Sequence, residues 1–134
     1  MTKRIPMLPL QEALYAMLTK YQTTPVYDDV PAGATLPYIT LGSFTCKPNG
    51  AKLTDISDLS LQIHIWSEYL GKKEVNEIAN DIITVLQSVS IDLSADEFEV
   101  LGQTIDFFEA FPEEIAGYHG VITLLMKIQN IKQA

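Results

Sequence analysis

The stretch LSLQIHIWS, residues 59–67, alternates apolar with polar side chains. In an extended chain one face would carry Leu59, Leu61, Ile63 and Ile65, and the other Ser60, Gln62, His64 and Trp66. This pattern predicts a β-strand that rests one face on a hydrophobic core. Trp66 falls on the polar face by position, so we expect it either beneath a helix or exposed to a partner.

On the C-terminal side, residues 72–89 repeat apolar side chains at helical spacing and carry polar ones opposite, which predicts a long amphipathic helix. Two segments rich in β-branched and aromatic residues follow, at 98–109 and from Tyr118 onward, and predict two strands. Gly102 is expected to mark a bulge in the first of them.

On the N-terminal side, apolar residues recur at helical spacing from Leu8 to Tyr21. A short strand is expected at 25–28, and Pro37 is expected to mark the start of a strand that begins at Tyr38. The polar segment 45–58 is long for a hairpin connection and is predicted to be a loop that is mobile or contacts a partner.

The element order is therefore helix, short strand, two strands, helix, two strands. This order predicts an α+β fold of two layers, in which a mainly antiparallel sheet of four to five strands packs against two helices. With 134 residues, the chain is expected to form one domain, residues 1–134.

The net charge is −8, and no lysine or arginine occurs between Glu74 and Met126. An acidic surface of this kind disfavours tight binding to DNA, because affinity for DNA depends on cations that neutralise its phosphates. No segment is long and apolar enough to cross a bilayer, and the first residues do not resemble a signal peptide, so an intracellular, soluble protein is expected.

The residues that could carry chemistry are few, and none forms a recognisable catalytic or metal-binding pattern. The single cysteine, Cys46, excludes a disulfide within the chain, and His64 and His119 lack nearby metal-ligand partners. Adjacent carboxylates such as Glu113 and Glu114 point apart in extended chain and do not converge on one substrate. We therefore expect no enzymatic activity, no cofactor and no metal.

Four blocks together resemble the tail completion proteins of long-tailed phages: LQEALYAMLTKY at 10–21, VYDDVPAGATLPYITLG at 26–42, LSLQIHIWSE at 59–68 and YHGVITLLMKIQ at 118–129. The resemblance covers nearly the whole chain and rests on the order and spacing of the blocks.

The resemblance implies a non-enzymatic structural protein of the virion, placed at the head–tail joint after assembly in the host cytoplasm. Such a protein caps the tail tube as a hexameric ring and joins the tail to the head connector. Its implied partners are further copies of itself, the tail tube protein and the head-completion (stopper) protein of the connector. DNA is expected to pass through the ring without tight binding, and the free protein is expected to be a monomer.

Two polar segments are predicted to contact partners, because binding residues concentrate in loops on a rigid scaffold. Their candidate residues are Lys47, Asn49, Lys52 and Asp55 in the first segment, and Phe111, Glu113, Glu114 and Tyr118 in the second. Two alternatives stay open. One is a small ligand-binding or enzymatic α+β domain with a helix–sheet pocket lined by Tyr38, His64 or Trp66, and the other is a soluble adaptor that binds through exposed aromatic residues.

Overall fold

The computed structural model describes residues 3–50 and 53–132. Its elements in chain order are helix α1 (Met7–Tyr21), strands β1 (Val26–Tyr27), β2 (Tyr38–Pro48) and β3 (Ile56–Ser67), helix α2 (Lys73–Ser88), the short 3-10 helix η1 (Ser94–Asp96), and strands β4 (Phe98–Pro112) and β5 (Tyr118–Asn130). The five strands form one sheet in the order β1-β2-β3-β5-β4. Only β1 and β2 pair in parallel, so the predicted α+β fold with a mainly antiparallel sheet is confirmed.

Strand β3 lies at the centre of the sheet, between β2 and β5. Its residues alternate between buried and half-buried along its whole length, as residues 59–67 predict. Leu61, Ile63 and Ile65 are fully buried, and their neighbours Ile122 and Leu124 on β5 join them in the core. The sheet therefore has a core face and an open face, and His64 and Trp66 belong to the open face.

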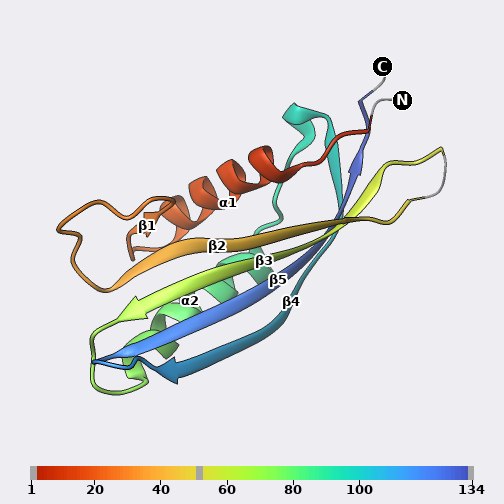
Figure 1. Ribbon diagram of the computed structural model, residues 1–134. Coiled ribbons are helices and arrows are strands. Elements are labelled where there is room, and N and C mark those ends of the chain that lie inside the picture. Colours follow the sequence, from red (N-terminus) through yellow and green to blue (C-terminus); the bar gives the residue numbers. More distant parts are fainter. Residues whose placement is uncertain (1–2, 51–52, 133–134) are drawn as a thin grey trace.

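Both helices cover the core face. Helix α1 contributes Leu10, Leu14 and Leu18 to the core, and α2 contributes an apolar stripe that includes Val75 and Ile82. Figure 1 shows α2 behind strands β3, β5 and β4, with α1 alongside β1 and β2. No helix among the described residues is long and apolar enough to cross a membrane.

The predicted loop at 45–58 is wrong in its extent. Strand β2 continues to Pro48, β3 begins at Ile56, and the backbone N–H of Asn49 donates to the carbonyl of Ile56, so the connection is a hairpin of residues 49–55. The sequence did not reveal these strand ends because polar residues occupy them, Lys47 in β2 and the buried Ser57 and half-buried Asp58 in β3, which removes the alternation between apolar and polar side chains. Lys52 lies outside the described residues.

Strand β4 is also longer than predicted, since it continues to Pro112. Its register against β5 shifts between Val100 and Gly102, as expected for a bulge at Gly102, and shifts again between Ile105 and Phe107. Bulges bend an edge strand and hinder its pairing with another chain.

The two long hairpins lie at opposite ends of the sheet. The β2–β3 hairpin lies beside Arg4 and Asn130, at what we call the terminal end, and the β4–β5 hairpin lies beside Ser67, at the distal end. Figure 1 shows them on opposite sides of the molecule. Because β3 has 12 residues, and each residue advances about 3.4 Å, the ends are roughly 40 Å apart.

Candidate functional site

At the terminal end, Arg4, Asp55 and Asn130 form a polar cluster that joins the two ends of the chain to the first hairpin. The backbone N–H of Arg4 and the side-chain amide of Asn130 donate to Oδ2 of Asp55, at 2.8 and 2.9 Å. The Arg4 guanidinium donates to Oδ1 of Asn130 and to the carbonyls of Asp96 and Glu97. This cluster therefore fixes the position of the β2–β3 hairpin relative to η1 and β5.

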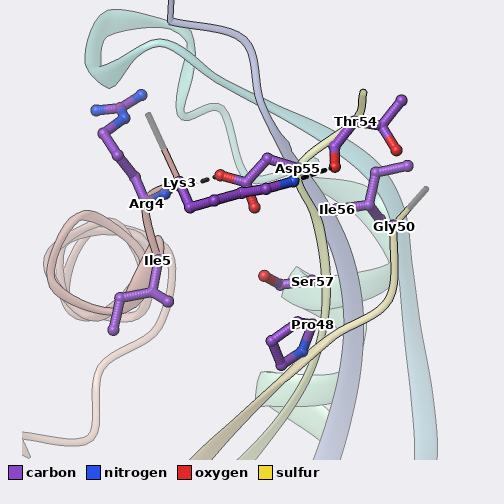
Figure 2. Close-up of a pocket in the computed structure, with 9 residues that line it drawn as sticks. All are labelled: Lys3, Arg4, Ile5, Pro48, Gly50, Thr54, Asp55, Ile56 and Ser57. Carbon is purple, nitrogen blue, oxygen red and sulfur yellow. Dashed lines mark hydrogen bonds between the residues drawn. The ribbon is translucent and has the colours of Figure 1, made fainter. Parts of the chain in front are cut away.

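A groove of about 610 Å³ opens beside this cluster, between the N-terminal segment and the β2–β3 hairpin. Its apolar lining comes from Ile5, Pro48 and Ile56. Lys3 crosses the groove near one end, where its ammonium group donates to the carbonyl of Thr54 at 2.5 Å. Figure 2 shows Ile5 on the wall opposite Ile56, with Lys3 stretched between the two walls.

The residues predicted for this end differ in accessibility. Lys47 and Asn49 are exposed, as surface contacts require. The side-chain amide of Asn49 donates to Asp58, which tethers Asn49 across the hairpin. Asp55 is only 7% exposed, because its carboxylate belongs to the cluster with Arg4 and Asn130. The sequence reasoning did not find Arg4 or Asn130, which lie far from Asp55 in the chain.

The distal end is formed by the β4–β5 hairpin, whose turn spans residues 113–117. The backbone N–H of Glu113 donates to the carbonyl of Gly117 at 2.9 Å, and Gly117 has a positive φ of 86° that favours glycine. Ile115 is 99% exposed, and Glu114 beside it is also exposed. The turn therefore presents an isoleucine and a carboxylate to solvent on a short, fixed connection.

The other two residues predicted for this end belong to the strands that flank the turn. Phe111 is exposed on the open face, and Tyr118 is half-buried against the core. The structure thus separates the two predicted segments to opposite ends of the sheet instead of bringing them together in one site.

Next to the distal hairpin, aromatic and imidazole rings stack on the open face. The rings of Trp66 and His119 lie 3.8 Å apart between centroids, and Phe111 contacts the other side of the cluster with its centroid 4.9 Å from that of His119. The Trp66 indole N–H donates to Oγ1 of Thr40 at 2.9 Å. Trp66 is therefore packed on the face away from the helices and is not beneath one.

A line of hydrogen-bonding groups connects His64, His119 and Glu113 through this cluster. Nδ1 of His64 lies 2.7 Å from Nε2 of His119, and Nδ1 of His119 lies 3.2 Å from Oε1 of Glu113. A consistent arrangement has His64 donating to His119 and His119 donating to the carboxylate, with both rings neutral. A further proton on Nε2 of His119 would face the N–H of His64.

Both histidines therefore resist protonation in the folded protein. Burial lowers the pKa of His64, and the neighbouring His119 lowers it further. Burial also lowers the pKa of His119, and this effect outweighs the opposing influence of the Glu113 carboxylate.

Acidification should consequently destabilise the fold. The unfolded chain takes up protons on these histidines near their ordinary pKa of 6.5, whereas the folded chain takes them up only at lower pH. The free energy of unfolding should then fall as the pH drops from about 7.5 to about 5.5. Urea unfolding at several pH values measures this, and a double variant His64→Gln, His119→Gln should show a flatter profile over that range. An equally steep profile in the variant would contradict the assignment.

Neither end has the features of a catalytic centre. No group of three or more histidine, cysteine or acidic side chains in the described ranges is placed to hold a metal ion. Cys46 is half-buried and packs against the core. The exposed hairpin residues and the groove are instead suited to contacts with other macromolecules, through apolar and charged side chains.

Solved structures share this fold. A chain in the virion of a native gene transfer agent (GTA) particle matches with a TM-score of 0.76 and 18% identity, over 90% of this chain and 94% of that one. The gp17 protein of bacteriophage SPP1 matches with a TM-score of 0.57 and 17% identity, over 92% of this chain and 91% of that one. At such identities the likeness shows the fold alone.

Among curated protein sequences, none matches the chain significantly. The model of one protein family, described as tail completion protein gp17, matches residues 10–128. This match covers both helices and both hairpins almost completely. The chain therefore belongs to the family of tail completion proteins gp17, and it is a non-enzymatic structural protein of the virion tail.

Proposed function

We propose that this protein caps the end of the tail tube as a ring and joins the tail to the head connector. The family match over residues 10–128 carries the proposal, since it covers nearly the whole chain. We further propose that residues 1–134 act as one domain in this role. The partners are further copies of the same chain, the tail tube protein and the stopper protein of the connector.

The shape of the molecule supports a role in assembly. A rigid sheet about 40 Å long carries one exposed hairpin at each end, and the two hairpins differ in sequence and charge. A subunit whose two ends differ can bind one end of itself to the opposite end of the next copy. Such contacts between unlike surfaces close into rings when the rotation between copies allows it. We propose a hexameric ring in the virion and a monomer before assembly.

We assign the assembly contacts to the candidate residues of the two hairpin segments, of which Glu113 and Tyr118 are half-buried and Lys52 lies outside the described residues. They are Lys47 and Asn49 at the terminal end, together with Lys52, and Phe111, Glu113, Glu114 and Tyr118 at the distal end. Asp55 supports the terminal end from inside, because it holds the hairpin through Arg4 and Asn130.

We also propose that DNA passes through the ring without binding tightly. Edge strand β4 carries the exposed acids Glu99, Asp106 and Glu109 and contains no lysine or arginine. Carboxylates of this kind repel phosphates. With β4 at the wall of the channel, that wall would offer DNA no cations to hold it.

Electron microscopy of assembly intermediates tests the proposal. Gold-labelled protein is mixed with purified headless tails and, separately, with filled heads. We expect label at one end of the tail tubes, and we expect the labelled tails to join heads on mixing. A variant with Lys47 and Asn49 both replaced by serine should fold normally and join fewer heads. Folded wild-type protein that labels neither tails nor heads would refute the proposal.

A further inference from the structure

The tip of the distal hairpin, which we define as residues 114–116, is an exposed apolar group next to a charge. Ile115 is 99% exposed, and Glu114 precedes it. The carboxylate of Glu113 is already engaged with His119, so Glu114 is the acid of the turn that forms no ion pair with the described residues. The tip therefore offers a partner a fully accessible apolar side chain with a carboxylate directly beside it.

The groove at the terminal end has the complementary features. Its apolar walls come from Ile5, which is 63% exposed, and from Pro48 and Ile56. Lys3 places an exposed ammonium group at its rim. Among the described charged residues that line it, Asp55 is buried and the Arg4 guanidinium is held by Asn130, Asp96 and Glu97, so Lys3 is the charge that an incoming group meets first. Its volume of about 610 Å³ exceeds what one side chain needs.

We infer that the tip of one copy inserts into the groove of the next, with Ile115 against Ile5 and Ile56 and with Glu114 paired to Lys3. The two surfaces match in both apolar character and charge. They lie roughly 40 Å apart in one molecule, so a single chain cannot bring its own tip into its own groove. We assign the groove to a second copy, because the tip of that copy supplies both the apolar side chain and the carboxylate that match the groove.

This contact joins unlike surfaces, so it repeats from copy to copy. A row of copies keeps a free tip at one end and a free groove at the other until it closes into a ring. Six copies placed end to end at roughly 40 Å each would close around a circle with a radius of roughly 40 Å. The inference rests on the proposed function for this ring, but the contact itself can be measured on the isolated protein.

A carbodiimide, which couples an ammonium group to a carboxylate in contact with it, provides the first measurement. Unlabelled and ¹⁵N-labelled protein are mixed, coupled and digested, and the Lys3–Glu114 peptide is sought by mass spectrometry. We expect this peptide in mixed-isotope form, which only a contact between copies can produce. Its absence at protein concentrations on the order of 1 mM, where even weak contacts are populated, would overturn the inference. Coupling of Lys3 to carboxylates elsewhere on a second copy would overturn it as well.

Charge reversal provides the second measurement. Lys3→Glu and Glu114→Lys should each weaken, by about tenfold or more, the self-association that sedimentation detects at protein concentrations on the order of 1 mM, since each places like charges in contact. A mixture of the two variants should associate again, because the altered groove of one then accepts the altered tip of the other. Ile115→Ser should also weaken association, and all three positions are exposed, so these variants should fold.

These outcomes separate the inference from the proposed function. The contact would be overturned if the single variants associate as strongly as the wild type. It would also be overturned if the mixture of the two variants associates no more strongly than each variant alone. The carbodiimide coupling can also be repeated with the protein bound to tail ends. If Lys3 then couples to the tail tube protein and not to a second copy, the groove binds that protein instead and the inference is wrong. Labelling of tail ends by the wild-type protein tests the proposed function separately.

Discussion

Replacing Gly117 by alanine should destabilise the protein by about 3 kcal/mol or more. A Cβ at this position would lie 2.0 Å from the carbonyl oxygen of Ser67 and 2.8 Å from Cα of Glu68, and both are backbone atoms that cannot rotate away. The residue also has a φ of 86°, which an alanine adopts at a cost of about 1–2 kcal/mol. Denaturant unfolding monitored by Trp66 fluorescence measures the loss.

The same substitution at Gly33 is the matched control. Gly33 has a φ of 82°, but a Cβ there would meet no atom within 4 Å. Gly33→Ala should therefore show only the backbone cost of about 1 kcal/mol. Equal losses in the two variants would mean that the contact between the distal hairpin and Ser67 is absent. We also expect the Gly117 variant to lose self-association at temperatures where it remains folded, because the hairpin must move to admit the methyl group.

Replacing Asp55 by alanine should cost about 3 kcal/mol of stability, because the backbone N–H of Arg4 and the amide of Asn130 would both lose a charged acceptor in a buried position. Asp55→Asn keeps one acceptor oxygen and should fall between the wild type and the alanine variant. Thermal or urea unfolding of the wild type and the two variants measures the order of their stabilities.

Asp58, three residues further along, is the control for this prediction. Its carboxylate lies 3.9 Å from the ammonium of Lys127 and accepts a hydrogen bond from the amide of Asn49, but these contacts are on the surface and the side chains of Asp58 and Lys127 are well exposed to solvent. Removal of a surface pair of this kind typically changes stability by less than about 1 kcal/mol. If Asp55→Ala were no more harmful than Asp58→Ala, the polar cluster would not hold the hairpin in place.

Much of the fold could be predicted because its signals are local. The alternation in residues 59–67 gave the central strand and its core face, and the helical stripe after residue 72 gave α2, since burial on one face imposes a period that the sequence displays. The ends of β2 and β3 escaped prediction, because no helix covers the sheet there and both faces tolerate polar residues such as Lys47 and Asp58.

The candidate sites could be predicted only in part, for the same physical reason. The sequence identified the two hairpins as exposed segments. It did not show that Asp55 meets Arg4 and Asn130, which are separated from it by 51 and 75 residues. It likewise placed His64 and His119 in strands, but their contact depends on the register of β3 against β5, which no local pattern encodes.

The position of β5 has a consequence for how the chain is made. Strand β5 leaves the ribosome after β3 and β4 but lies between them, so the sheet cannot close until β5 has been made. Until then β3 and β4 expose unpaired edges, and closing them requires contacts between residues as far apart as Ile56 and Gln129. Nascent chains should therefore depend on chaperones or fast release to avoid aggregation, and a premature stop before residue 118 should yield insoluble product instead of a partly active fragment.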